Sequence, residues 1–230
     1  MALAGGVEIL LDESMYLDLS AAKILSPEGR CRTFDSSANG IGLGEGCGVL
    51  VLKSLQSAIA DGDKIYGVID GTAVNNDGNT MGVTTPNPEA QRELIEAAIK
   101  DGNVHPDTIT YVEAHGTGTL IGDPIELKAL TQVFGNYTSN KQFCGVGSVK
   151  TNLGHLLSAA GAASIIKVLL SMTAGELPPT LNCDQPNPRF NFNDSPFYLV
   201  RETMLGRANR MYAGRASVLL DWAATMRTLL

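Results

Sequence analysis

Residues 108–124 read TITYVEAHGTGTLIGDP, a short β-branched run that leads directly into a histidine set among glycines and threonines. A second stretch, FCGVGSVKTNLGH at 143–155, has the same order of apolar run, polar turn and histidine. Short apolar runs bounded by glycine are typical of buried strands. The two stretches therefore predict an α/β fold in which two strand ends at the carboxyl edge of a sheet each carry one imidazole, His115 and His155.

Further elements are predicted on both sides of these stretches. Strands are expected at EILL (8–11), GVLVLK (48–53) and KIYGVIDGTAV (64–74). Helices are expected over 54–63, after Asn87-Pro88, after Asp123-Pro124 with Glu126 completing a capping box, and from about His155 to Met172. The last of these is apolar nearly all round, which indicates a helix buried on most sides. Five prolines predict an extended loop over 176–196.

Composition excludes several classes of function. The 230 residues are 44% apolar, which is enough for a sizeable core. A formal charge of −7 without a basic cluster argues against nucleic acid or an anionic membrane surface as the partner. No stretch approaches the roughly 20 apolar residues of a membrane span, and the first residues lack a signal-peptide pattern. We therefore expect a cytoplasmic protein.

Cysteine and glycine spacing excludes two further kinds of site. The four cysteines have no CxxC spacing, so neither a zinc site nor a disulfide framework is indicated, and buried inert thiols are expected (Cys31, Cys47, Cys144 and Cys183). The run GIGLGEGCG (40–48) precedes a strand instead of following one, unlike a dinucleotide-binding loop. Close backbone packing explains these glycines better.

The histidines suggest a specific chemistry. Two neutral imidazoles can donate two Nε2–H hydrogen bonds to one developing oxyanion, and the ammonium of Lys150 would favour their neutral form. This arrangement suits the stabilisation of an enolate. A two-histidine metal hydrolase is a weaker alternative because no third ligand accompanies the pair, and His115 alone would be read as a turn histidine. The third histidine, His105, matches no such pattern and is expected at the surface.

Four motifs together resemble a known family. VEAHGTGTLIGDPIE, SVKTNLGH, NNDGNTMGVTTPNPEAQ (75–91) and ELPPTLNCDQPNP resemble the carboxyl-terminal half of a β-ketoacyl synthase, and they are most similar to ketosynthase domains of polyketide synthases. The resemblance covers residues 1 to about 205. It implies a thiolase-like fold, an α/β/α/β/α sandwich that is incomplete here. Residues 1–57 would be a remnant of the amino-terminal half, 58–214 the carboxyl-terminal half and 215–230 an out-of-family tail.

The resemblance also implies an activity. The family performs decarboxylative Claisen condensation in polyketide and fatty acid biosynthesis, using acyl and malonyl thioesters on the phosphopantetheine of an acyl carrier protein, with no other cofactor and no metal. His115 and His155 would be the active-site histidines and Lys150 the lysine that accompanies them. Thr117 and Thr119 would line the pantetheine channel, although a turn stabilised by side-chain-to-backbone bonds explains them equally well. The intact family forms homodimers.

The family's nucleophilic cysteine precedes the segment that here reads ALAGGV at residues 2–7, and none of the four cysteines fits its motif. We therefore expect the chain alone not to catalyse condensation. A non-catalytic ketosynthase-like module that binds a carrier protein or a partner subunit is the alternative. The apolar runs VEILL and GVLVLK should be exposed, which predicts poor solubility.

The residues after Gly214 depart from the family pattern. Synonymous codons can be chosen for 214–230 such that the frame starting at the last base of the Gly214 codon reads AGVSSFGLGGNNAHVV, which resembles the family's GVSSFGFGGTNAH. We predict a frameshift near residues 211–215, which would leave Trp222 and its neighbours packed poorly or in a helix instead of a closing strand. Nucleotide sequencing tests this, and codons that do not encode SSFG and NAH in the shifted frame would contradict it.

Overall fold

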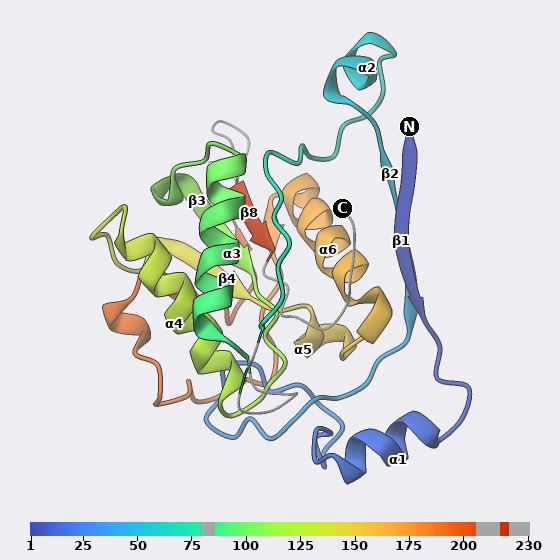
Figure 1. Cartoon of the computed structure of the whole chain (residues 1–230), viewed down its shortest axis with the longest axis vertical. Helices are drawn as coiled ribbons and strands as arrows, with labels where there is room; N and C mark the ends of the chain where they lie inside the picture. Colours follow the sequence, from blue (N-terminus) through green and yellow to red (C-terminus); the bar gives the residue numbers. More distant parts are fainter. Residues whose placement is uncertain (79, 81–85, 206–216, 221–230) are drawn as a thin grey trace.

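The computed structural model describes residues 1–78, 80, 86–205 and 217–220. At its centre is a parallel sheet with the strand order β6-β4-β3-β8 (Figure 1). Its strands are β3 (Ile109–Glu113), β4 (Cys144–Gly147), β6 (Phe197–Leu199) and β8 (Ser217–Leu220). Parallel strands need crossover connections; α4 (Gly122–Gly135) lies between β3 and β4 in the chain, and α5 (Lys150–Leu153) and α6 (Ala160–Ala174) lie between β4 and β6.

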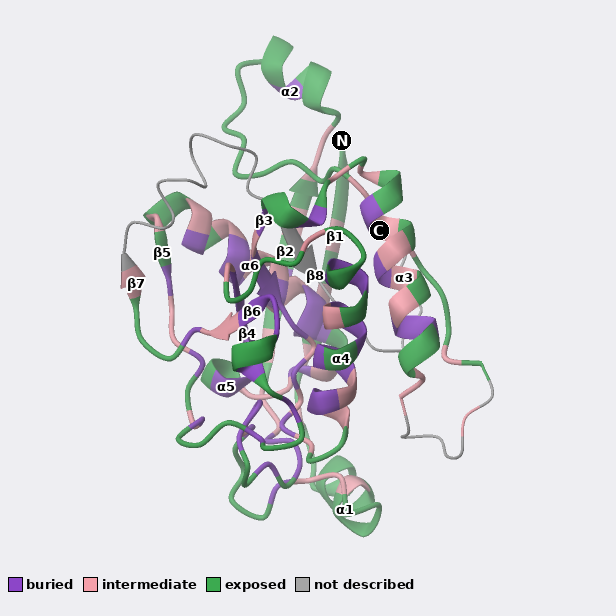
Figure 2. Cartoon of the chain, turned by 90° about the vertical axis from the view of Figure 1, so that its left-hand side faces the viewer, coloured by how far each residue is buried: buried purple, intermediate pink, exposed green. Residues whose placement is uncertain are grey.

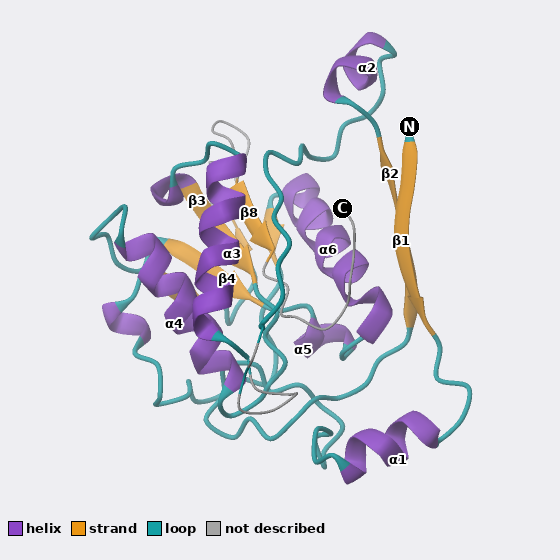
Figure 3. Ribbon diagram, viewed as in Figure 1, coloured by secondary structure: helices purple, strands orange, loops and turns teal. Residues whose placement is uncertain are grey.

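Helices cover both faces of this sheet (Figure 3). On one face lie α3 (Pro88–Asp101) and α4 (Gly122–Gly135), which pack with Val112 and Val146 of the sheet into the larger core. On the other face lies α6 (Ala160–Ala174), where Val168 packs against Tyr111. Since successive strand residues point to opposite faces, Tyr111 and Val112 serve the two cores separately. The sheet is thereby buried on both sides, as parallel sheets usually are.

Beyond α6 lies a two-stranded antiparallel ribbon of β1 (Ala2–Glu8) and β2 (Gly46–Leu52). The inner face of this ribbon lies very close to α6 and to the turn before it. A Cβ on Gly6 would lie 2.3 Å from the Ser158 carbonyl oxygen, and one on Gly48 would lie 2.9 Å from Ile166. The layers therefore run helix, sheet, helix, ribbon. The glycines of the ribbon are required by this contact, and those of the 40–48 run also meet neighbouring atoms, which confirms the packing interpretation.

Short elements complete the chain. They are α1 (Ser14–Ala21), α2 (Leu55–Ala60), α5 (Lys150–Leu153), β5 (Glu176–Leu177), β7 (Met204–Leu205) and the 3₁₀ turns η1 (Pro106–Thr108), η2 (Leu157–Ala159) and η3 (Phe192–Asp194). The predicted strands at 48–53, 108–115 and 143–149 are confirmed, as are the helix over 54–63 and the Asn87 cap, whose side chain accepts from the Glu89 and Ala90 N–H groups.

Three expectations are wrong. The first strand is Ala2–Glu8, so most of EILL lies outside it, because the pairing with β2 sets the boundary. Residues 64–74 form no strand, since no neighbouring strand pairs with them among the described residues. Asp123 does not cap α4, which begins at Gly122 after Ile121; its carboxylate bonds the preceding turn instead.

The helix α6 also differs from expectation. It buries one face, which includes Ser164, Lys167 and Ser171, while Leu170 is exposed, so the helix is not buried on most sides. Contrary to the expectation of no membrane-length stretch, residues Leu157–Ala174 have the length and mean hydropathy, 1.6, of a span by composition alone. Because Lys167 and Val168 of this helix pack against Glu113 and Tyr111 of the sheet, we interpret the segment as a core helix.

The tail falls mostly outside the described residues, including Trp222 and 221–230. The expectation that no strand forms in this tail is wrong for Ser217–Leu220, which pair in parallel with β3. The sequence SVLL is apolar and partly β-branched, and β3 offers it an open strand edge. The predicted frameshift is a statement about the gene that these four residues leave untested.

The outer face of the ribbon is apolar and faces solvent, in contrast to the parallel sheet, whose strand β4 is coloured as buried in Figure 2. Cross-strand neighbours Leu3 and Val51 are 69% and 67% exposed, and Val7 and Val49 lie on the same face at 54% and 59%. A flat apolar face with two open strand edges favours association between copies. The expected exposure of the GVLVLK run is confirmed.

We predict that the triple variant Leu3→Thr/Val49→Thr/Val51→Thr remains monodisperse at concentrations where the natural chain self-associates. Threonine keeps the β-propensity of the ribbon while it removes apolar surface. Size-exclusion chromatography with light scattering measures the mass of both chains. The matched control changes three scattered exposed residues, Leu11, Leu55 and Leu181, to threonine and should behave like the natural chain. Equal self-association of all three proteins would contradict a role for the ribbon face.

Candidate active site

The carboxyl ends of β3 and β4 bring the two histidines together. The strands are parallel neighbours with Glu113 opposite Gly147, so both ends open at the same edge of the sheet. His115 follows β3 by two residues and His155 follows α5. Their ring centroids lie 5.7 Å apart at an interplanar angle of 83°. Both side chains are partly buried, so the pair forms one site as the sequence predicts.

Two buried carboxylates shape the turn that carries His115. Glu126 accepts the N–H groups of His115 at 2.6 Å and Gly116 at 2.9 Å. Asp123 accepts the N–H groups of Gly118 at 3.1 Å and Thr119 at 3.4 Å, and its other oxygen accepts that of Phe34 at 2.8 Å. The sequence pattern GDPIE thus builds the active-site turn instead of a capping box.

Lys150, the first residue of α5, bonds the same turn. Its ammonium donates to the carbonyl oxygen of His115 at 2.5 Å, and the residue is only 3% exposed. The Ser148 hydroxyl donates to the carbonyl oxygen of Gly116 at 3.1 Å. The backbone of His115 is therefore bonded at its N–H by a carboxylate and at its carbonyl by an ammonium, which leaves the imidazole as its free functional group.

The glycine run near the amino terminus holds His155. The His155 N–H donates to the carbonyl oxygen of Gly42 at 2.7 Å, and the N–H of Gly44 donates to the His155 carbonyl at 3.1 Å. A Cβ on Gly44 would lie 2.2 Å from the Leu153 carbonyl oxygen, so no larger residue fits there. The Leu157 N–H donates to Nδ1 of His155 at 3.0 Å. In the neutral ring this bond places the proton on Nε2.

Burial and charge keep both imidazoles neutral near pH 7. Burial, and then the positive charge of Lys150, lower the pKa of His155 to about 3. The same two causes, with a contribution from His155, hold the pKa of His115 well below its usual value of 6.5. Burial also raises the pKa of Asp123 to about 6. Neutral imidazoles beside a buried ammonium can donate hydrogen bonds to an oxyanion and are poor proton donors.

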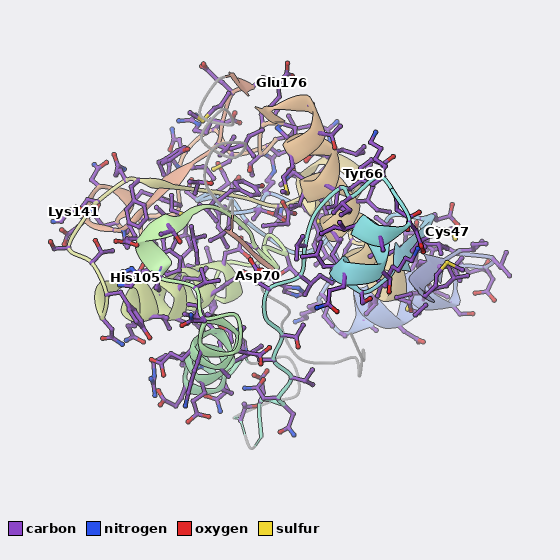
Figure 4. The ribbon with its side chains drawn as sticks, turned by 90° about the horizontal axis from the view of Figure 1, so that it is seen from above. Cys47, Tyr66, Asp70, His105, Lys141 and Glu176 are labelled. Carbon is purple, nitrogen blue, oxygen red and sulfur yellow. The ribbon has the colours of Figure 1, made fainter. Side chains whose placement is uncertain are left out.

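The other predicted residues take varied positions. Thr117 and Thr119 lie partly buried in the His115 turn, with their hydroxyl oxygens 3.5 Å apart. Cys31, Cys144 and Cys183 are buried, whereas Cys47 is exposed on the ribbon, contrary to expectation. His105 is exposed beside Asp107. Figure 4 shows Cys47 and His105 in widely separated parts of the molecule.

Sequence reasoning missed the supporting groups. Glu113, two residues before His115, is buried and bonds Val149, and Asp123 and Glu126 bond the turn as described. The sequence did contain a sign of these groups, because the three acidic residues lie in segments that are otherwise apolar and expected to be buried. Buried carboxylates are uncommon without partners, so hydrogen-bond partners could have been expected for them. Throughout the described part of the chain, no group of three or more histidine, cysteine or acidic side chains is arranged to hold a metal ion.

A cavity of about 610 Å³ lies beside the site and not on it. It is bounded by the ribbon on one side and by α5 and α6 on the other; its lining includes Leu153, Leu156, Ile166, Lys167 and Leu170. The two histidines do not line it. Val149 also lines the cavity, and Val149 and Leu156 are the sequence neighbours of Lys150 and His155.

Comparison with known proteins places these features in a family. Residues 66–184 match "Beta-ketoacyl synthase, C-terminal domain" and residues 1–58 match "Beta-ketoacyl synthase, N-terminal domain". The chain is 50% identical over 202 residues to polyketide synthase PksL and 47% identical over 209 residues to PksN, both of Bacillus subtilis. Each alignment covers 88% of this chain and 4% of the relative, so the chain spans a small part of these proteins.

Solved structures give the same result. The chain is similar to the ketosynthase from module 6 of the bacillaene synthase of Bacillus subtilis 168, with a TM-score of 0.87 and 49% identity. That alignment covers 89% of this chain and 37% of the other. An oxazolomycin ketosynthase domain of Streptomyces albus gives a TM-score of 0.86 at 40% identity, covering 89% and 36%.

The buried imidazoles predict a dependence of stability on pH. The pKa of His155 is about 3 in the folded chain and about 6.5 when unfolded, so its contribution is complete above pH 6.5 and is lost as the pH falls toward 3. At pH 5 this loss is about 2 kcal/mol. Asp123, with a pKa raised from 3.8 to about 6, acts in the opposite direction over that range.

We therefore expect His155→Gln to reduce the loss of unfolding free energy between pH 7 and pH 5 by about 2 kcal/mol. The amide oxygen of glutamine can still accept the Leu157 N–H but does not titrate. Urea unfolding at the two pH values measures the difference. The exposed His105→Gln variant is the control and should keep the natural pH dependence. If His155→Gln had the same pH dependence as the natural chain, the pKa of this imidazole would not be lowered by burial and by the charge of Lys150.

Proposed function

The chain belongs to the β-ketoacyl synthase family and corresponds to part of a polyketide synthase ketosynthase domain; from this premise we propose that His115, His155 and Lys150 stabilise the enolate of a malonyl-type thioester during decarboxylation. The fold is the thiolase-like α/β fold expected from the sequence, present in part. The family is one of acyltransferases. The reaction, substrates and partners of the whole protein are proposals for this chain.

One observation carries the proposal. The bond from the Leu157 N–H to Nδ1 of His155 leaves an Nε2–H donor on a neutral ring. A donor of this kind suits the thioester oxygen, which gains negative charge as the bond between the α-carbon and the carboxylate breaks and carbon dioxide leaves. The electron pair of that bond forms the enolate. A neutral His115, 5.7 Å away between ring centroids, would supply the second donor.

Lys150 acts through its charge and not as an acid. Its ammonium is bonded to the His115 carbonyl oxygen. Burial is the first cause that lowers the pKa of both imidazoles, and the charge of Lys150 is the second. A protonated imidazole would tend to transfer its proton to the enolate carbon or oxygen, whereas a neutral one keeps the enolate available for carbon–carbon bond formation. The positive charge also favours the developing oxyanion directly.

The nucleophile of the condensation does not belong to this set of residues. Cys31 donates to the Gly42 carbonyl, and burial raises the pKa of its thiol, so it is a packed structural group. The acyl group would therefore be presented by a cysteine outside this chain's residues. The enolate carbon would attack that thioester carbon, and the cysteine thiolate would leave.

The extender would arrive on the phosphopantetheine of an acyl carrier protein. Thr117 and Thr119 lie on the His115 turn, where their hydroxyls can bond amides of the arm. A homodimer remains a prediction from the resemblance, and a cytoplasmic location remains a prediction from the sequence composition. A carrier-binding module without chemistry would not need two buried neutral imidazoles, and a metal hydrolase would need a third ligand.

We predict that the triple variant Leu3→Thr/Val49→Thr/Val51→Thr, called the ribbon variant below, releases carbon dioxide slowly from a malonyl-pantetheine thioester. It should form no condensation product when an acyl thioester is added. His115→Ala and His155→Ala should each reduce carbon dioxide release roughly 100-fold, because each removes a donor to the oxyanion. Mass spectrometry of the thioester products measures both reactions. His105→Ala is the control and should retain the rate. Condensation by the chain alone, or decarboxylation that does not depend on either histidine, would contradict the proposal.

A further inference from the structure

A buried ion pair lies on the face of β3 that packs against α6. The Lys167 ammonium donates to Oε2 of Glu113 at 2.7 Å, and the two side chains are 8% and 0% exposed. The Tyr111 hydroxyl donates to the same oxygen at 2.8 Å, and Lys167 also donates to the Tyr111 hydroxyl at 2.9 Å. Gly147 provides the room for this cluster, since a Cβ there would lie 2.6 Å from the Tyr111 hydroxyl.

The second oxygen of Glu113 reaches the neighbouring strand. Oε1 accepts the N–H of Val149 at 2.6 Å. Val149 is the residue before α5, and α5 begins with Lys150. One carboxylate therefore joins the end of β3, two residues before His115, to the turn that carries Lys150 and to α6.

Stability alone is a poor explanation for this pair. Removing two charges from water costs several kcal/mol per ion, and replacement of such pairs by apolar residues is often neutral or stabilising. Fixing the relative placement of two strand ends is a task that a carboxylate with two differently directed oxygens performs well. The position of the pair beside both catalytic turns is consistent with that task.

We propose that Glu113, held by Lys167, is a positioning residue of the candidate site: it fixes the turn of Lys150 against the His115 turn and supplies the negative charge that the Lys150 ammonium faces. This inference rests on the proposed function only for its catalytic consequence. The placement of Lys150 and its charge state can be tested without a substrate.

The electrostatic surroundings of Lys150 support this assignment. Burial lowers the pKa of Lys150, and nearby negative charges oppose that effect, Glu113 first among them. The titratable groups that face this ammonium are Glu113 on β3, Asp123 and Glu126 on α4, Cys31 in the amino-terminal segment, and the imidazoles of His115 and His155. The Lys167 charge, bonded to Glu113, partly cancels the carboxylate as seen from Lys150.

Three chains give a sharp test: the natural chain, Glu113→Gln, and Glu113→Gln/Lys167→Met, each in the ribbon variant. Glutamine keeps the shape of the side chain but not its charge, so the pKa of Lys150 should fall. It should fall less in the double variant, because the unpaired Lys167 charge that repels Lys150 is gone. The double variant contains no unpaired buried charge at this pair and should unfold at higher urea than Glu113→Gln.

Lysine labelled with ¹³C at Cε reports each titration by NMR. The chain has eight lysines, and the Lys150→Arg variant identifies the signal of Lys150 by its absence. The matched control is Asp35→Asn, which neutralises a buried carboxylate that bonds Ser37 and Gln185 away from Lys150. It should lose stability without shifting the Lys150 signal. An unshifted Lys150 titration in the double variant, whether or not the single variant folds, would overturn the proposal and leave Glu113 a structural residue.

Carbon dioxide release then separates this inference from the proposed function. If both hold, Glu113→Gln should lower the rate roughly 10- to 100-fold, and the upper pH limit of activity should move down with the Lys150 titration. A shifted Lys150 titration with a pH profile that does not follow it would retain the positioning role and refute the catalytic role of Lys150.

Discussion

The parallel pairing of β3 with β4 is the constraint on which the site depends. His115 and His155 are 40 residues apart in the sequence, and only the shared carboxyl edge of the two strands brings their rings within 5.7 Å. The pairing continues past β3, since the Ala114 N–H donates to the Gly147 carbonyl at 2.8 Å. Beyond that bond the segments that follow β3 and β4 leave the sheet, and side chains instead of backbone groups form the hydrogen bonds between them. The site begins where regular hydrogen bonding ends, as is usual for α/β sheets.

Beyond the end of the sheet, three carboxylates and one ammonium form the hydrogen bonds to backbone groups that a neighbouring strand would otherwise form. Glu126 and Asp123 accept the N–H groups of the His115 turn, Glu113 accepts that of Val149, and Lys150 donates to the carbonyl oxygen of His115. Charged partners form stronger bonds to backbone groups than neutral partners do, and they lie in a region where water cannot substitute. The negative charges are tolerated because Lys150 and Lys167 lie among them. Burial, and then the charge of Lys150, lower the pKa of both imidazoles and keep them neutral.

The sequence was sufficient for the parts of this arrangement that are local. A β-branched run, a polar turn and an N-cap proline are properties of neighbouring residues, so β3, β4 and the start of α3 could be predicted, and the two histidines followed from the strand ends. The partners of Asp123 and Glu126 could not, because a capping box and a support for a distant turn require the same residue types. Residues 64–74 have strand composition but no strand beside them among the described residues, and composition does not reveal a pairing partner.

The helix α6 shows why hydropathy misleads near such a site. By composition it is apolar enough to cross a membrane, and an apolar helix is expected to direct its largest apolar side chains toward the core. Here the polar side chains of Ser164, Lys167 and Ser171 are buried and Lys167 reaches Glu113 of the sheet, whereas Leu170 is exposed, and Ile166 and Leu170 border the cavity under the ribbon together with Lys167 and Ser171. The burial of Lys167 follows from Glu113: its buried charge needs a cation within reach, and α6 is the element that covers it. Once Lys167 is directed inward, the helical period places Val168 against Tyr111 of the sheet and Ile166 and Leu170 beside the cavity, so a carboxylate that holds two strand ends together also influences which face of α6 is buried.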